Sequence, residues 1–321
     1  MQRRQFLQTT PLVLGASYAA YAEGVMPMAK LGKTGLQVSR FTLGGAHMHW
    51  RKDEALSIRI IHRAMDLGVN FFDSAAKYHD GRSDEVYGVA LAGGRRQKVL
   101  LMSKAEKRDK ASAMAQLENT LRRMKTDYLD LWQCHEVVTQ AEVDKILGPG
   151  GSLEAFVQAK KEGKVRHIGF TGHADPEVHL RLLRSFDGWE TVQHPVNLID
   201  PHYLSFVKNV LPEVGKKGWG RIGMKSNAMG GIGNANIATI TECLRFSWSQ
   251  SIDTLVSGVE TVEQLEHNVG VLKSLEKMAP AEVTKVLERT KQGPVGAGIE
   301  KYKRKPDAAG LWPAHEDGVA D

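Results

Sequence analysis

The feature of this sequence that most restricts its fold is a regular alternation of two patterns between residues 41 and 275. Short apolar runs of strand length, rich in Val, Ile, Phe and Leu, alternate with longer amphipathic stretches of helical periodicity. Eight runs have strand character, at residues 41–45, 71–75, 99–104, 129–135, 167–172, 191–195, 221–225 and 254–258. The helical patterns lie at residues 53–67, 83–92, 110–124, 151–162, 177–186, 203–217, 238–250 and 262–275.

Strands joined by helical crossovers pair in parallel, and eight such strands can close on themselves. The pattern therefore predicts an α/β fold, a single-domain (β/α)8 TIM barrel. An open doubly wound sheet is the competing fold, and it usually carries a glycine-rich phosphate-binding loop after its first strand. No such loop follows residues 43–47 here, which favours the barrel. Pro176 in a first helical turn, and Thr261 followed by Gln264 as in a capping box, agree with the expected helix starts.

The segments on either side of this pattern are expected to have different structures. Residues 28–40 read as two short strands around a glycine-containing turn, so we expect an N-terminal β-hairpin that plugs the barrel floor. Beyond residue 275 no stretch has equal regularity, and glycine and proline recur from Gly293 to Pro313. We therefore expect the barrel domain to cover residues 23–275 and residues 276–321 to be a C-terminal extension, whose final segment from Gly293 is an extended arm over the barrel mouth.

The first residues resemble a twin-arginine export signal. Arg3 and Arg4 precede a short apolar stretch at residues 11–18 and a small-residue cleavage site at residues 20–22. We predict that residues 1–22 are a signal peptide cleaved after Ala22, and hence a periplasmic or otherwise exported protein, or a cytoplasmic one if the signal is not used. An uncleaved membrane anchor is the alternative, although the apolar stretch is shorter than the ~20 residues of a comfortable span. No later stretch is expected to span a membrane.

The charge of the chain argues against one class of partner. The chain has 43 basic and 37 acidic residues, a difference of 43 − 37 = +6. Arg3 and Arg4 lie in the leader, and a cluster at residues 301–305 lies in the tail, so the remaining body is nearly balanced. A nucleic-acid surface needs basic residues spread along a groove or helix, and we therefore expect no nucleic-acid partner.

The chain has two cysteines, Cys134 in an expected strand and Cys243 in an expected helix. Neither has the spacing of a metal-ligand set. We predict that both pack in the core and that they form no disulfide.

Four residues that can transfer protons lie at or just beyond successive strand ends, where a parallel barrel places its catalytic groups. Asp73 lies near the end of the second strand, Tyr78 in the loop after it, Lys104 at the end of the third and His135 at the end of the fourth. An adjacent ammonium stabilises the phenolate form of a tyrosine. We therefore expect Lys104 to activate Tyr78 as proton donor or acceptor, with Asp73 holding the lysine. His135 would orient a carbonyl or hydroxyl oxygen.

At these positions the sequence resembles the aldo-keto reductase family. Residues 71–78, Phe-Phe-Asp-Ser-Ala-Ala-Lys-Tyr, look like the family's motif on its second strand, continued by Gly81, Ser83, Glu85 and Gly88. Similar stretches follow at residues 103–104, 121–135, 163–169, 193–197 and 257–268. The resemblance covers residues 28–275 and implies the barrel, a nicotinamide dinucleotide cofactor, and a catalytic tetrad of Asp73, Tyr78, Lys104 and His135.

The resemblance also implies where the dinucleotide binds. The family commonly has Ser-Asn after strand five, whereas residues 171–173 here are Thr-Gly-His, so Thr171 and Gln193 are the expected contacts of the carboxamide. Many members stack a tyrosine on the nicotinamide, and here Met224 or Lys225 is expected in that place. The full expected cofactor-binding set is Thr171, Gln193, Met224, Lys225, Ser226, Gly258, Glu260, Gln264 and Asn268.

The residues after the last strand bear on the choice between NAD and NADP. Family members that prefer NADP usually place Lys or Arg there, because a 2′-phosphate requires cationic partners. This chain has Glu260, which would repel a phosphate but can accept a hydrogen bond from a ribose hydroxyl, and Gln264 at the usual arginine position. We expect NAD(H) to be slightly favoured over NADP(H), unless a basic residue such as Arg245 reaches the site.

The loop after the first strand supplies the expected substrate contacts, His47, His49 and Trp50. His47 and His49 could instead bind a metal together with His79, but no carboxylate has a supporting spacing. We therefore predict a pocket wall and no metal.

The expected activity is the interconversion of a carbonyl and an alcohol on a small molecule, a sugar or polyol-like compound. Because no reduced nicotinamide pool is expected outside the inner membrane, the cofactor is expected to stay tightly bound. One alternative is a redox-neutral glycosidase or epimerase that uses bound NAD as an internal hydride carrier. A second is a non-catalytic, dinucleotide-binding regulatory subunit. Direct hydrolysis by paired carboxylates, with Asp84, Glu85 or Glu136 as partner of Asp73, is disfavoured because Asp73 is expected to pair with Lys104.

Overall fold

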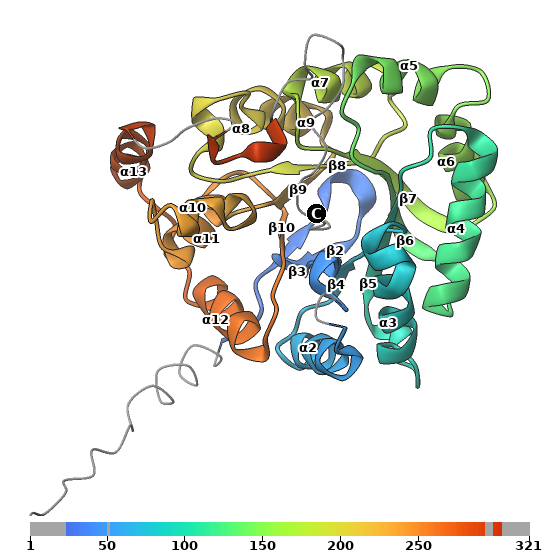
Figure 1. The fold of residues 1–321 in the computed structure, drawn as a ribbon, viewed down its shortest axis with the longest axis horizontal. Coiled ribbons are helices and arrows are strands. Elements are labelled where there is room, and N and C mark those ends of the chain that lie inside the picture. The colour runs from blue at the N-terminus through green and yellow to red at the C-terminus, as the bar shows by residue number, and fades with distance from the viewer. Residues whose placement is uncertain (1–23, 50–51, 293–297, 304–321) are drawn as a thin grey trace, which may run out of the picture.

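Eight parallel strands close into a barrel in the computed structural model, which describes residues 24–49, 52–292 and 298–303 (Figure 1). The strand order around the barrel is β10-β3-β4-β5-β6-β7-β8-β9. The strands are β3 (Phe41–Leu43), β4 (Phe71–Asp73), β5 (Leu100–Ala105), β6 (Leu129–Cys134), β7 (Val165–Thr171), β8 (Thr191–Pro195), β9 (Gly220–Met224) and β10 (Thr254–Ser257). Each predicted strand is present with both ends within two residues of the prediction, and the pairing of β10 with β3 rules out an open sheet.

Helices surround the barrel on its outside (Figure 1). The α-helices are α2 (Glu54–Asp66), α3 (Arg82–Ala90), α4 (Lys110–Met124), α5 (Gln140–Leu147), α6 (Ser152–Lys161), α7 (Pro176–Ser185), α8 (Phe206–Asn209), α9 (Leu211–Lys217), α10 (Gly231–Asn234), α11 (Ile240–Ser249), α12 (Val262–Lys273) and α13 (Pro280–Gln292). Short 3-10 helices are η1 (Gly32–Thr34), η2 (Gly45–His47), η3 (Tyr78–Gly81), η4 (Arg96–Lys98), η5 (Asp200–His202), η6 (Ala228–Gly230) and η8 (Lys301–Lys303).

The main core lies between the barrel and the helices. Trp132 of β6 stacks on Phe156 of α6 with ring centroids 4.0 Å apart, and Trp189 packs edge-on against Phe156 at 5.9 Å. Because successive residues of a strand point to opposite faces, the apolar residues of each strand face both the barrel interior and this outer layer. Both cysteines are buried and free, as predicted.

Helix boundaries follow local signals. Pro176 is in the first turn of α7, as expected. Helix α5 was not predicted, although its capping box of Thr139 and Glu142 is present in the sequence. The single helix expected at residues 203–217 is two, α8 and α9, and Pro212 stands in the first turn of the second.

The predicted N-terminal hairpin is present and closes the floor of the barrel. Strands β1 (Met28–Lys30) and β2 (Gln37–Ser39) pair antiparallel, and Leu31 between them packs in a cluster with Ile222. Gly32 adopts a φ of 48°, and a Cβ there would lie 2.3 Å from the backbone nitrogen of Gly220. Only glycine fits so close to the start of β9, which explains the glycine of the turn.

The C-terminal extension is more regular than predicted. Helix α13 lies in a part of the extension where the sequence showed no comparable pattern, so this helix was not predicted. It is held to α11 by ion pairs of Arg245 with Glu282 at 2.7 Å and of Arg289 with Glu242 at 2.8 Å. Residues 298–303 then return to the loop after β8, where Lys303 pairs with Asp200. The signal-like residues 1–22, Trp50 and the last residues from 304 lie outside the described residues.

No helix in the described part of the chain combines the length and the apolar character that crossing a bilayer requires.

Candidate active site

The four side chains expected to transfer protons meet at the C-terminal end of the barrel strands. Asp73 ends β4, Tyr78 opens η3, Lys104 is next to last in β5 and His135 directly follows β6. The Lys104 ammonium lies 2.5 Å from Asp73 Oδ1, and it donates to the Tyr78 hydroxyl at 3.1 Å and to the Ser74 carbonyl at 2.9 Å. Its three protons therefore have three oxygen partners. The His135 ring packs edge-on against the Tyr78 ring, with centroids 5.6 Å apart.

Burial controls the charges of this group. The side chains of Lys104 and Asp73 are only 1% and 2% exposed. Burial raises the pKa of Asp73, and the Lys104 charge opposes that rise; burial likewise lowers the pKa of Lys104, and Asp73 opposes the fall. Each charge is therefore sustained by the other. A cation 3.1 Å from the phenol oxygen stabilises the phenolate form of Tyr78.

A buried network beneath the tetrad holds the loop that carries Tyr78. Ser74 donates to Asp84 at 2.6 Å, and Thr120 of α4 donates to the other carboxylate oxygen at 2.9 Å. Burial raises the pKa of Asp84 to about 6. Asp84 is not among the described residues that line the cavity, so it supports the site rather than acting in it, and it cannot serve as a hydrolytic partner of Asp73.

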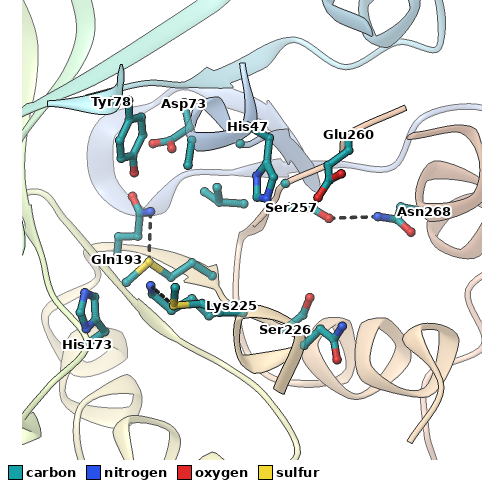
Figure 2. A pocket seen from close by; sticks show the side chains of 18 of the residues that line it. His47, Asp73, Tyr78, His173, Gln193, Lys225, Ser226, Ser257, Glu260 and Asn268 are labelled. Carbon is teal, nitrogen blue, oxygen red and sulfur yellow. Dashed lines mark hydrogen bonds between the residues drawn. The ribbon is translucent and has the colours of Figure 1, made fainter. Parts of the chain in front are cut away.

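The tetrad forms one part of the wall of a cavity of about 610 Å³. All nine residues expected to bind the cofactor also lie on this wall: Thr171, Gln193, Met224, Lys225, Ser226, Gly258, Glu260, Gln264 and Asn268. Figure 2 shows five of these side chains around the same space as Tyr78 and Asp73: Gln193, Lys225, Ser226, Glu260 and Asn268.

Of the three expected substrate contacts, the structure places one on the cavity wall. His47 lies on the cavity wall, and Trp50 lies outside the described residues. His49 is not among the described wall residues. Its ring packs edge-on against the His79 ring with centroids 6.4 Å apart, and its backbone N–H donates to the Ser57 hydroxyl at 2.9 Å. The positive φ of His49, 72°, turns this part of the loop away from an extended path. Among the described residues there is no group of three His, Cys, Asp or Glu side chains placed to hold a metal.

The cavity wall beyond β10 is acidic and polar. Burial lowers the pKa of His47, while Glu260 opposes the fall, and Figure 2 shows the Glu260 carboxylate beside the His47 ring. Gln264 accepts from the Glu260 backbone N–H at 2.8 Å. Asn268 donates to Ser257 at 3.2 Å. Arg245 is bound to Glu282 and is absent from the described wall residues.

The comparison with known proteins agrees with this arrangement. The model of the Aldo/keto reductase family matches residues 40–241. This chain belongs to the aldo/keto reductase family.

Individual relatives are more distant. The uncharacterized oxidoreductase YqkF of Bacillus subtilis is 33% identical over 158 residues, which cover 46% of this chain and 49% of that protein. The aldo-keto reductase YhdN of the same organism is 28% identical over 190 residues, covering 54% of this chain and 55% of the relative. The chain thus spans about half the length of these curated relatives. The solved structure of aldo-keto reductase AKR11C1 from Bacillus halodurans, in its holo form, covers 86% of this chain and 99% of its own, with 21% identity and a TM-score of 0.71.

The structure gives a physical reason for one departure from the aldo-keto reductase pattern. At Gly172, where the family commonly has Asn, a Cβ would lie 2.6 Å from the carbonyl oxygen of Val137 and 2.6 Å from Cε1 of His179. An asparagine therefore does not fit between β6 and α7. Gln193 remains available: its Oε1 is buried without a hydrogen-bond partner among the described residues, while its Nε2 contacts the Met224 sulfur at 3.5 Å (Figure 2).

Several wall residues of this aldo-keto reductase were not predicted from the sequence to line the cavity. They include Glu136, His173, Asn227, Glu263 and His267. Glu136 and His173 follow the ends of β6 and β7, so a consistent search of every strand end could have found them. Glu263 and His267 lie on α12, where the sequence shows only a helical pattern.

Proposed function

We propose that this protein is a nicotinamide-dependent oxidoreductase that interconverts a carbonyl and an alcohol, with Tyr78 as proton donor and acceptor. The observation that carries the proposal is the 3.1 Å contact between the Tyr78 hydroxyl and the Lys104 ammonium on the wall of the cavity. A phenol held beside a buried cation can give a proton to a forming alkoxide or take one from an alcohol. All four tetrad members are present, which argues against a purely regulatory, dinucleotide-binding role.

The residues of the cavity fit a nicotinamide dinucleotide. The unpartnered Oε1 of Gln193 can accept from the amide of a carboxamide, and Thr171 at the end of β7 offers a hydroxyl near it. Gly258 has no Cβ, and one added there would lie 2.3 Å from His47 Nδ1, so a glycine keeps this edge of the cavity open. When bound, the dinucleotide supplies the hydride acceptor or donor.

We further propose that NAD(H) is preferred to NADP(H). The described wall residues between Ser257 and Asn268 include Glu260 and Glu263 but no lysine or arginine. A 2′-phosphate near these carboxylates would lack a cationic partner and would be repelled. A ribose hydroxyl can instead donate to Glu260.

The proposal is tested with purified protein by measuring hydride transfer between dinucleotide and small carbonyl or polyol substrates. Tyr78→Phe removes the proton and leaves the cavity shape, so turnover is expected to fall roughly 10²–10⁴-fold, while dinucleotide binding by fluorescence titration is retained. The matched control is Tyr203→Phe, which makes the same chemical change on the loop after β8, outside the described wall residues. Equal turnover in wild type and Tyr78→Phe would remove Tyr78 from the mechanism.

We also propose export through the twin-arginine route, supported by the residues around Arg3 and Arg4. An exported enzyme has no reduced nicotinamide pool to draw on, which favours a tightly held cofactor and a sugar- or polyol-like substrate. Epimerisation or glycoside cleavage through transient oxidation is the second candidate under this proposal.

Replacing both arginines by lysine should retain the protein in the cytoplasm, as measured by cell fractionation. Complete loss of dinucleotide on dialysis would contradict the tight binding.

A further inference from the structure

Two titratable side chains on the cavity wall take no part in the proton transfer described above. Glu136 directly follows His135, and His173 lies two residues beyond β7. The Glu136 Oε1 and His173 Nε2 atoms are 3.3 Å apart, and the other oxygen of Glu136 is bound by the Lys77 ammonium. The side chains of Glu136 and His173 are 16% and 5% exposed. The pair is therefore a largely buried, hydrogen-bonding surface in the same cavity as Tyr78.

The backbone holds Glu136 in an uncommon conformation. Its φ is 49°, in the left-handed region that residues other than glycine rarely adopt. Arg108 secures it, because one guanidinium nitrogen donates to the carbonyls of His135 at 2.7 Å and Glu136 at 2.9 Å. Arg108 is itself fixed by Glu142, which accepts from it at 3.0 and 2.9 Å. Conformations of this kind persist where the surrounding structure enforces them, and they cluster at binding sites.

His173 is held from the opposite side. The ring of Tyr302 packs edge-on against the His173 ring, with centroids 5.2 Å apart. Tyr302 donates to Glu300 at 2.8 Å, and Glu300 accepts from Asn197 at the same distance. In Figure 2 His173 lies at the border of the cavity that Tyr78 and Gln193 also face. Both members of the pair are thus fixed before a substrate arrives.

The chemistry of this pair selects among ligands. An apolar substrate covering it would remove water from a carboxylate and an imidazole and supply no hydrogen bond in return, which is unfavourable. An anionic group has no proton to donate to the Glu136 carboxylate, whose charge Lys77 already balances. A hydroxyl group can donate to a Glu136 oxygen, because a carboxylate oxygen accepts more than one hydrogen bond, while His173 holds the carboxylate in place.

We propose that Glu136 and His173 form a binding subsite for a substrate hydroxyl near the carbon that reacts at Tyr78. The substrate class is accordingly a polyhydroxylated carbonyl or alcohol, a sugar or polyol, rather than a simple aldehyde or an organic acid. This inference rests on the proposed function and names the substrate class of the same site.

The test compares two three-carbon aldehydes, glyceraldehyde and propanal, which differ in the hydroxyls beside the carbonyl. Wild type is expected to favour glyceraldehyde in kcat/KM by at least roughly tenfold, because a site built to bind a hydroxyl rejects the analogue that lacks it. In Glu136→Gln and His173→Phe this preference should fall at least roughly fivefold, chiefly through KM for glyceraldehyde. Differences in hydration of the two aldehydes cancel because the comparison is between variants. Glu106→Gln, a half-buried carboxylate on the loop after β5 that is absent from the described wall residues, is the matched control.

An unchanged preference in both variants would overturn the subsite. If wild type reduces neither aldehyde, the proposed function fails, and binding decides the subsite separately. Saturation-transfer NMR with dinucleotide present would compare xylitol with pentane-1,5-diol, the same carbon chain without the inner hydroxyls. Selective binding of xylitol that is lost in Glu136→Gln supports the subsite without turnover. Equal signals for xylitol and pentane-1,5-diol, or no binding of either, contradict it.

Discussion

Replacing Lys303 with methionine should destabilise the protein strongly, although the residue lies far from the tetrad in sequence. Its side chain is fully buried, and its ammonium lies 2.5 Å from Asp200 Oδ1 and 2.8 Å from Glu300 Oε2. Methionine keeps most of the volume and removes the charge. Two buried carboxylates would then face each other without a cation.

The magnitude follows from what each carboxylate retains. Removing one partner of a buried ion pair costs about 3–5 kcal/mol. Asp200 keeps three donors, the Ser205 hydroxyl at 2.8 Å and the backbone N–H groups of Phe206 at 3.0 Å and Val207 at 2.9 Å. Glu300 keeps the two hydrogen bonds that Asn197 and Tyr302 donate to its other oxygen, Oε1. We therefore expect the lower end of the range, ~3 kcal/mol, and a fall in Tm of roughly 5 °C.

The loss should depend on pH in a defined direction. Burial raises the pKa of Glu300, Lys303 opposes the rise, and Asp200 adds to it. Without Lys303 the folded-state pKa rises further above the unfolded value of about 4.3. Stability linked to such a carboxyl is full below the unfolded pKa and is lost as pH rises through the folded pKa. The Lys303→Met deficit should therefore be larger near pH 8 than near pH 5.

Thermal unfolding followed by circular dichroism at the two pH values provides the assay. Lys301→Met, an exposed lysine of the same short helix, is the control and should change stability by less than ~0.5 kcal/mol. A Lys303→Met variant with wild-type Tm, or with a deficit that grows on acidification, would refute this reasoning.

Three further predictions concern the site. Asp73→Asn removes the carboxylate that opposes the fall in the Lys104 pKa, so the basic limb of the pH–rate profile should move to lower pH, and an unshifted profile would count against the pair. Gln264→Arg introduces a cation at the acidic end of the cavity and should raise the NADP to NAD ratio of kcat/KM by roughly tenfold or more in initial-rate assays; an unchanged ratio would place the 2′-position elsewhere. Gly172→Asn should lower Tm rather than tighten dinucleotide binding, because its Cβ meets the Val137 carbonyl; a stable variant with tighter binding would show that the contact relaxes.

The fold and the tetrad could be predicted because their signals are local. Alternating apolar runs and helical patterns give the strand order directly, and all eight strands form where expected. In a parallel barrel every strand ends at the same rim, so Asp73, Lys104 and His135 are brought together by their place in the strands alone. The hairpin at residues 28–40 was also found from its glycine-containing turn.

Short or irregular elements were harder to find. Helix α5 is only eight residues long, and in α13 the apolar face is small, with Val283, Val286 and Leu287 packed in a cluster that includes Phe246 of α11. His49 shares its loop with His47, yet the backbone conformation at the turn takes it off the cavity wall. Spacing in the sequence could not distinguish the two.

The sequence by itself determined the barrel and the rim at which its polar residues collect, because strand period and chain order are properties of neighbouring residues. Only the tertiary structure decided which rim residues touch. Glu136 meets His173, and Lys303 meets Asp200, across long separations in the chain. Such contacts depend on how the closed barrel and the returning C-terminal segment pack. A buried charge without a partner is costly, so the packing that pairs these charged side chains is favoured.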